Sequence, residues 1–277
     1  MQTILTKDFL SNDKWNDILK KYKNNKSFVE NNCPFSKNIT SNSKSQNGED
    51  ILLENIFKKI YFTNKHIVDI GAWDGVYLSN TLLFKKKYNC TRLLIEGNEK
   101  KIQNASIGEK IVQSIVSSEN INTLLKDLPD KFDLLSIDID GNDYYVIKAM
   151  EKKPRVIILE YHPGLPNDFP LVIIENKDTM KSYRDKEVTD KEFYINNNHN
   201  GYWGANMLAY VKLLKDKGYS FVTSKGDNLI FVIKNEFNKL NIKEMDTDYI
   251  IKNYFQPNTY WGVDNKPYDD TLWCIPI

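Results

Sequence analysis

Apolar and polar positions along the chain alternate in blocks that predict strands and helices in turn. Short apolar runs occur in HIVDIG, RLLIEGN, KIVQSIVS, FDLLSIDID and RVIILEYHP, with helix-forming segments between them. Near-continuous runs of Val, Ile and Leu are typical of parallel strands that helices cover on both faces. The pattern therefore predicts an α/β protein with five strands in a parallel sheet.

The last part of this pattern predicts a different strand arrangement. After the helix-forming segment ANMLAYVKLLKDKG come two apolar runs, YSFVTS and LIFVIK, separated by KGDN. Gly226 and Asp227 between apolar runs are typical of the turn in a β-hairpin. The complete fold prediction is a Rossmann-like doubly wound sheet of seven strands, mostly parallel with a terminal antiparallel hairpin, with helices on both faces.

The same patterning divides the chain into three parts. Residues 1–44 are polar, and one short amphipathic segment there predicts an N-terminal helical extension. Residues 45–235 contain the alternating strands and helices, with an insertion at 163–203 that is rich in Pro, Asn and charged residues. Long loops inside compact domains are often lids or binding insertions. Residues 236–277 have scattered aromatic residues and are expected to pack on the domain as a tail.

Composition and charge narrow the possible partners. The chain has 38 Lys and Arg residues against 37 Asp and Glu residues, so no global field favours binding to nucleic acid. Its three cysteines are far apart, which indicates neither a disulfide framework nor a zinc site. No apolar run approaches the ~20 residues of a membrane span. A cytoplasmic protein fits this composition best.

The stretch from His66 to Asn80, HIVDIGAWDGVYLSN, is the best candidate for a ligand-binding turn. It places Asp69 at the end of a strand, and Gly71 and Gly75 let the backbone turn and approach a ligand closely. The spacing D-x-G-x-x-x-G differs from both the dinucleotide-binding G-x-G-x-x-G and the P-loop. A pyrophosphate ligand is therefore disfavoured, and a simple strand-turn-helix corner is the alternative.

Ionisable residues cluster after the fourth and fifth strands. They are Asp138, Asp140, Asp143, Glu160 and His162. Carboxylates repel one another unless they share protons or bind cations. Asp138, Asp140 and Glu160 are therefore predicted to be ligands of a divalent metal, most simply Mg²⁺. Asp143 is equally well explained as a charge at the N-terminus of the following helix.

Five motifs, in order, carry a resemblance to a known family. They are SQNGED, VDIGAWDGVYLSNT, LLIEGN, LLSIDIDGNDYYVIKAM and PRVIILEYHP. This set resembles the FkbM-like branch of the class I S-adenosylmethionine-dependent methyltransferases over about residues 45–235. The group commonly O-methylates sugars in surface polysaccharides, glycolipids and glycosylated natural products, so the resemblance implies an O-methyltransferase with a sugar or glycan acceptor. Gly97 is a departure, because the family often has proline there.

The resemblance also implies which residues bind the cofactor. Asp69 and the glycine turn would face its methionine end, and Glu96 would accept hydrogen bonds from both ribose hydroxyls, as a carboxylate can. The loop at 117–119 would lie near the adenine. The full set of predicted cofactor residues is Asp69, Gly71, Asp74, Gly75, Ser79, Asn80, Glu96, Ser117 and Asp138. Ser79 and Asn80 are equally consistent with helix caps.

Methyl transfer to a hydroxyl also needs a base. His162 is the first candidate because histidine titrates near neutral pH, and Asp140 and Asp138 are the others. A histidine that caps the strand and bonds the backbone is the alternative for His162. The predicted acceptor contacts, all in the insertion, are His199, Tyr202 and Trp203.

The sequence is also compatible with two other functions. Asp138-Ile139-Asp140 is formally a D-x-D motif, typical of metal-dependent glycosyltransferases, although that function leaves Glu96 and the glycine turn unexplained. The second alternative is a methyltransferase fold that serves only as a binding module. Binding of S-adenosylhomocysteine rather than a nucleotide sugar would favour the methyltransferase.

Overall fold

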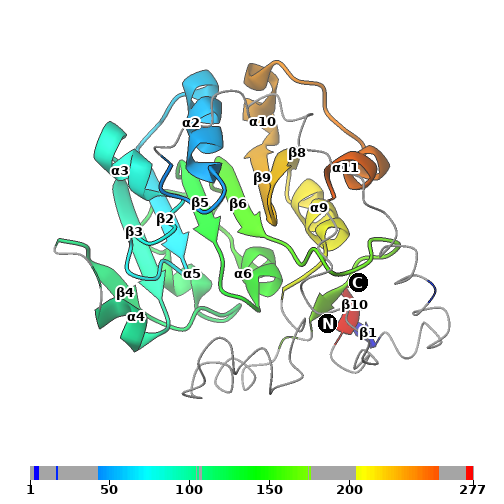
Figure 1. Ribbon diagram of the computed structural model, residues 1–277, viewed down its shortest axis with the longest axis horizontal. Helices are drawn as coiled ribbons and strands as arrows, with labels where there is room; N and C mark the ends of the chain where they lie inside the picture. The colour runs from blue at the N-terminus through cyan, green and yellow to red at the C-terminus, as the bar shows by residue number, and fades with distance from the viewer. Residues whose placement is uncertain are drawn as a thin grey trace.

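A seven-stranded sheet forms the centre of the protein (Figure 1). The computed structural model describes residues 3–5, 17, 43–103, 105, 108–173, 175, 204–255 and 273–276. The strands of the sheet are β2 (His66–Ile70), β3 (Thr91–Glu96), β4 (Ile111–Gln113), β5 (Leu134–Ile137), β6 (Val156–Glu160), β8 (Tyr219–Lys225) and β9 (Asn228–Ile233). They are ordered β4-β3-β2-β5-β6-β9-β8.

The strand directions confirm the predicted fold class. Strands β2 to β6 are parallel, whereas β9 is antiparallel to both β6 and β8. The hairpin turn at Gly226 and Asp227 lies where the sequence predicted it. Strand β2 lies between β3 and β5, so the order reverses beside it, and open α/β sheets bind ligands at such a switch point.

Helices cover both faces of the sheet. On one face lie α5 (Ile121–Leu124), α6 (Asp143–Ala149), α9 (Met207–Asp216) and α11 (Thr247–Tyr254). On the other lie α2 (Glu49–Ile60), α3 (Leu82–Tyr88), α10 (Lys234–Phe237) and the 3₁₀ helix η3 (Asn238–Leu240), while α4 (Glu99–Gln103) follows β3. Alternate strand residues supply each core: Val68 and Ile70 face the first group, and Ile67 faces the second. Among the described residues, no helix combines the length and apolarity needed to cross a membrane.

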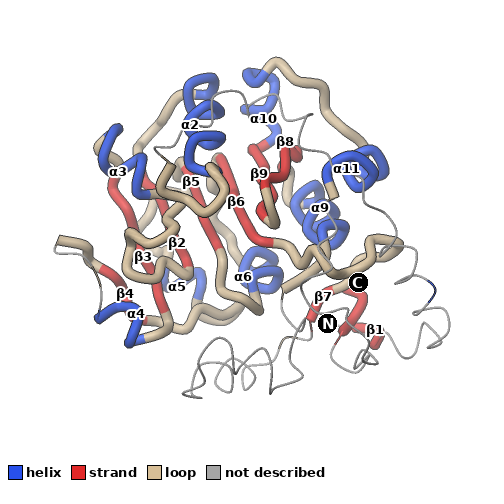
Figure 2. The backbone as a smooth tube through the Cα atoms, viewed as in Figure 1, coloured by secondary structure: helices blue, strands red, loops and turns tan. Residues whose placement is uncertain are grey.

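A second, small sheet joins segments from distant parts of the chain. It consists of β1 (Thr3–Leu5), β10 (Trp273–Pro276) and β7 (Val172–Ile173), and Figure 2 shows these short strands grouped beside the main sheet. The sequence did not predict this sheet, because strands this short leave no alternating pattern. The helix predicted within residues 1–44 lies largely outside the described residues.

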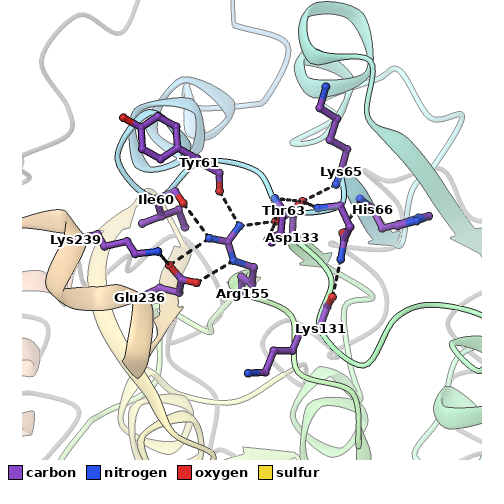
Figure 3. Close-up of polar contacts among 11 residues, drawn as sticks. Ile60, Tyr61, Thr63, Lys65, His66, Lys131, Asp133, Arg155, Glu236 and Lys239 are labelled. Carbon is purple, nitrogen blue, oxygen red and sulfur yellow. Dashed lines mark hydrogen bonds and ion pairs between the residues drawn. The ribbon is translucent and has the colours of Figure 1, made fainter.

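The amino edge of the main sheet is held by a buried ion pair. Asp133 and Arg155 precede β5 and β6, and the Arg155 Nη1 atom lies 2.6 Å from Asp133 Oδ1 (Figure 3). The Asp133 carboxylate also accepts backbone N–H bonds from Thr63, Asn64 and Lys65. Arg155 donates further bonds to carbonyl oxygens at the end of α2 and pairs with Glu236. One ion pair therefore ties two strands to α2 and to the loop before β2.

Removing the charge of Asp133 should destabilise the protein strongly. Asp133→Asn should lower the free energy of unfolding by about 3–5 kcal/mol, because the buried Arg155 loses its closest carboxylate and keeps only the pair with Glu236. Urea denaturation measures this change. Asp130→Asn is the matched control: the Asp130 side chain is fully exposed and 3.5 Å from Lys152, so we expect a change within about 0.5 kcal/mol.

The loss of stability in Asp133→Asn should also depend on pH. Burial alone would raise the pKa of Asp133, but the hydrogen bonds from Arg155 and from the backbone of Thr63 and Lys65 hold that pKa below its ordinary value. The stabilisation is thus fully present above the unfolded-state pKa of about 3.9 and is lost as pH falls through the lower folded-state pKa. The difference between wild type and Asp133→Asn should shrink below about pH 4. A difference that stays constant down to pH 2 would contradict this assignment.

Candidate active site

The candidate site lies at the carboxyl edge of the main sheet. The parallel strands β2, β3, β5 and β6 all end at this edge. The turn of the β8–β9 hairpin lies there too, because Glu160 at the end of β6 pairs with Asn228 at the start of β9. Predicted site residues from separate motifs therefore meet at one edge of the sheet. The hairpin turn adds residues that do not follow a parallel strand, so the rule that sites lie at the carboxyl ends of parallel strands does not select them.

The turn after β2 touches the segment after β5 through backbone atoms. Gly71 has a φ of +82°, and a Cβ atom there would lie 1.7 Å from the backbone oxygen of Asp138. The Asp138 N–H in turn donates to the Ile70 oxygen at 3.0 Å. No side chain larger than hydrogen fits at Gly71, so glycine is required here for packing as well as for its dihedral angle.

The Asp69 carboxylate bonds to side chains at the end of the glycine turn. Its Oδ2 atom accepts hydrogen bonds from the Thr81 hydroxyl at 2.6 Å and the Ser79 hydroxyl at 3.4 Å, both at the far end of the turn. Burial raises the pKa of the Asp69 carboxyl, and the Thr81 hydrogen bond and the charge of Arg92 offset part of that rise. Asp69 therefore links the end of β2 to the end of the loop that follows it.

Two other predicted cofactor residues also make local bonds. Asp74 Oδ1 accepts from the backbone N–H groups of Val76 and Tyr77, at 2.9 and 2.7 Å, which closes the second half of the turn. The Asn80 side chain donates to the Ser136 hydroxyl at 3.3 Å and so links the turn to β5. Both residues lie in the same loop as Gly75.

Glu96, at the end of β3, is a buried carboxylate aimed at the glycine turn. Its Oε2 atom accepts from the Trp73 N–H at 3.0 Å, and its Oε1 atom accepts from the Asn98 N–H at 2.8 Å. Only 2% of the residue is exposed. Two backbone donors thus fix the carboxylate between the loops that follow β2 and β3.

The loop predicted to lie near the adenine connects to the insertion. The Ser118 hydroxyl donates to the Glu175 carboxylate, and Ser117 N–H donates to the Asn120 side chain at 2.8 Å. Glu175 belongs to the insertion and lies two residues after β7. Ser117 itself is half-buried, so part of its surface remains open to solvent.

Three carboxylates converge beyond β5 and β6. Asp138, Asp140 and Glu160 each offer an oxygen, and these oxygens all lie within 4.8 Å of one another. Solvent reaches Asp138, yet the protein atoms crowded around its carboxyl raise the pKa well above its ordinary value, and the charges of Asp140 and Asp143 raise it further. Desolvation followed by the charges of Asp138 and Asp140 likewise raises the pKa of Glu160. This cluster can bind a cation or hold protons.

Asp227 extends this cluster, and the sequence analysis did not select it. Its side chain is hydrogen-bonded to Glu160, which requires a proton on one of the two carboxyls. Burial raises the pKa of Asp227 as well. The residue appeared in the sequence only as a hairpin turn residue. The signal that could have found it is the antiparallel pairing with β6, which puts this turn at the carboxyl edge.

Asp143 lies outside the open part of the cluster. Its carboxylate accepts the backbone N–H groups of Ile139 and Gly141 at 3.0 and 3.1 Å, at the start of α6. Burial raises its pKa to about 6, and these two backbone bonds offset part of the rise. The geometry matches the helix-terminus alternative for Asp143. Asp140 beside it has a φ of +53°, a conformation that non-glycine residues adopt rarely and that often marks functional sites.

His162 is fully buried, unlike the carboxylates before it. Its backbone N–H donates to the Ala205 oxygen at 2.8 Å, and its Nδ1 atom accepts from the Gly164 N–H at 3.1 Å. An imidazole that accepts at Nδ1 carries its proton on Nε2 when neutral. Taking up a second proton would break the bond to Gly164. These two hydrogen bonds hold the segment after β6 in place.

Tyr210, on α9, is a second residue that the sequence analysis missed. It is fully buried, and its hydroxyl has no hydrogen-bond partner in the part of the chain that is described. Burial raises its pKa, and the charges of Asp143, Glu160 and Asp138 raise it further. The phenol therefore lies near the acidic cluster. Its position in a helical apolar pattern gave no sign of this.

The insertion begins and ends at the same edge of the sheet. The Asn206 side chain donates to the backbone oxygens of Pro166 and Phe169 at 2.6 and 2.8 Å and accepts from the Leu171 N–H at 3.1 Å. These bonds join the two ends of the insertion beside His162. The predicted acceptor contacts lie outside the described residues; they are His199, Tyr202 and Trp203.

One family of known proteins matches this chain. The Methyltransferase FkbM domain family matches residues 74–221, just over half of the chain. No curated protein sequence matches the chain significantly.

Solved structures of methyltransferases are also similar to this chain. One is a putative methyltransferase from an antibiotic biosynthesis pathway of Anabaena variabilis, with 18% identity over 42% of this chain and 46% of that chain, and a TM-score of 0.30. The chain thus spans about half the length of that protein. A SAM-dependent methyltransferase of Archaeoglobus fulgidus has 14% identity over 76% of this chain and 90% of that one, with a TM-score of 0.36. One from Clostridium acetobutylicum has 12% identity over 67% and 90%, with a TM-score of 0.38.

The family match covers the glycine turn from Asp74, the buried Glu96 and the acidic cluster after β5 and β6. The seven-stranded, mostly parallel sheet with its terminal hairpin is the fold that the sequence predicted for such a protein. The chain belongs to the FkbM methyltransferase domain family.

Proposed function

We propose that this protein transfers a methyl group from S-adenosylmethionine to a hydroxyl of a sugar or glycan. The observation that carries the proposal is Glu96, a buried carboxylate fixed beside the glycine turn by two backbone N–H groups. Membership of the FkbM family supports methyl transfer. The motif resemblance to sugar O-methyltransferases supports the choice of acceptor. A glycosyltransferase that uses Asp138 and Asp140 would explain neither the family match nor the buried Glu96 carboxylate.

Glu96 can bind a diol while its backbone donors stay in place. A carboxylate has about four acceptor positions, and the N–H groups of Trp73 and Asn98 use two of them. The other two can accept both hydroxyl protons of the cofactor ribose. Because the backbone bonds already fix the carboxylate, little side-chain entropy is lost when the ribose binds.

A carboxylate of the cluster after β5 and β6 is the proposed base. The bound cofactor supplies an electrophilic methyl group, and in-line transfer needs the acceptor oxygen about 3–3.5 Å from it. Asp138 and Asp140 are exposed at the edge of the site, and the Asp138 backbone touches Gly71. His162 is buried and bonded to Gly164, so we assign it to positioning the segment after β6 and give the proton to Asp140.

The same carboxylates have the composition of a magnesium site. Asp138, Asp140 and Glu160 provide hard oxygen ligands, and their spacing of 4.8 Å or less fits one cation. When bound, Mg²⁺ would polarise the acceptor hydroxyl and lower its pKa. Asp227 would then orient Glu160 through their hydrogen bond. His199, Tyr202 and Trp203 of the insertion are the proposed contacts to the acceptor sugar.

Substitution of Glu96 should weaken cofactor binding. Glu96→Ala removes two hydrogen bonds to a charged acceptor, each worth about 1.5–3 kcal/mol, so the Kd for S-adenosylhomocysteine should rise at least about tenfold. Isothermal titration calorimetry measures this. Glu99→Ala is the matched control, because Glu99 is exposed three residues further along, and its Kd should equal that of wild type. Absence of any binding to wild type would refute the proposed function.

Chelation and three substitutions should identify the proton acceptor. If Mg²⁺ is bound, EDTA should abolish turnover and added Mg²⁺ should restore it. Asp140→Asn should lower kcat by roughly 10²–10⁴ with S-adenosylhomocysteine affinity intact, because it removes the base, and Asp138→Asn should raise the Mg²⁺ requirement. His162→Asn should keep kcat within a few-fold, since an asparagine oxygen can still accept from Gly164.

The opposite pattern would reassign these roles. An inactive His162→Asn enzyme that binds the cofactor normally, together with an active Asp140→Asn enzyme, would make His162 the base. Full turnover in excess EDTA would remove the metal from the mechanism and leave the carboxylates as proton carriers only.

A further inference from the structure

The glycine turn exposes three large apolar side chains. Among the described residues, seven large apolar side chains are exposed, and Trp73, Tyr77 and Leu78 are three of them. The Trp73 and Tyr77 rings lie 5.2 Å apart, so the exposed groups are adjacent. A group of exposed rings beside a ligand cleft commonly contacts the ligand.

Trp73 is held next to Glu96 by its backbone. Its N–H donates to Glu96 Oε2 at 3.0 Å, and the N–H groups of Gly71 and Ala72 both donate to the Ile95 oxygen. These three bonds join the turn to the end of β3. They fix Trp73 at a φ of +51°, where a bulky residue is strained. Trp73 is 39% exposed in this conformation.

A lysine covers the face of the Trp73 ring. Lys101, on α4, places its Nζ atom 3.9 Å from the ring centroid. Trp73 lies in the turn that bonds to Glu96, and Lys101 lies in the helix that follows β3. An exposed cation–π contact shifts an equilibrium by only about two- to fivefold, whereas stacking of a nucleobase on an aromatic ring gives about five- to 150-fold. A nucleobase can therefore displace Lys101.

We propose that Trp73 forms the stacking surface for the adenosyl group of the cofactor, and that Lys101 occupies this surface until the cofactor displaces it. The proposal rests on the proposed function, since Glu96 must hold the ribose beside the indole. It assigns Trp73 to the cofactor and not to the acceptor because its backbone is bonded to β3, on the opposite side of β2 from β5 and the acidic cluster.

Calorimetric titration with S-adenosylhomocysteine tests both parts of this proposal. Trp73→Ala should raise the Kd about five- to 150-fold, and Trp73→Phe should raise it less because a ring is kept. Lys101→Met should lower the Kd about two- to fivefold, because no cation then competes for the ring. Tyr249→Ala is the matched control: Tyr249 is similarly exposed on α11, and its removal should leave the Kd unchanged.

Trp73→Gly separates stacking from a structural role. Glycine relaxes the strained backbone, so the Tm of this variant should be equal to or higher than that of wild type while its Kd rises as in Trp73→Ala. Wild-type affinity in both Trp73→Ala and Trp73→Gly would overturn the stacking surface, and an unchanged Kd in Lys101→Met would overturn the displacement. If wild type itself does not bind S-adenosylhomocysteine, the proposed function fails instead.

Discussion

The site depends on the backbone contact between Gly71 and Asp138. A Cβ atom at Gly71 would lie 1.7 Å from the Asp138 oxygen, so the turn after β2 and the segment after β5 are as close as two backbones can be. This contact sets the position of the acidic cluster relative to the glycine turn. Hydrogen bonds from Gly71 and Ala72 to Ile95 join the same turn to β3 on its other side. The predicted cofactor residues and the carboxylates are thus positioned by one backbone contact between the ends of two adjacent strands.

Acidic residues at the two edges of the sheet have opposite electrostatic environments. At the amino edge Asp133 is neutralised by Arg155 and by backbone N–H groups, which makes the pair a structural element. At the carboxyl edge no salt bridge between described residues neutralises Asp138, Glu160 or Asp227, and the pKa of each is raised, chiefly by burial or crowding. Carboxylates held close together without a counter-charge are costly in a folded protein, and function is the usual reason for them.

Buried hydrogen bonds support the site from the segment before the first strand. Glu49 and Asp50 of SQNGED are both fully buried at the start of α2. Asp50 accepts from Ser43, Ser45 and the Ile51 N–H, while Glu49 accepts from Asn47 and from Asn228 at the hairpin. The segment therefore connects α2 to the turn that carries Asp227. Its polar residues act on the site through the hairpin.

The sequence by itself determined the sheet, the glycine turn and the strand-end acidic residues. These follow from local rules, because apolar runs define buried strands and parallel strands bring their carboxyl ends together. The tertiary structure decided what each polar residue does. Only the packing of β9 against β6 brings Asp227 to Glu160, and only the burial of His162 and its bond to Gly164 remove its access to solvent. The small sheet of β1, β7 and β10 was equally out of reach, because its strands are short and pair across almost the whole chain. Contacts between residues distant in sequence depend on the complete fold, and no local pattern encodes them.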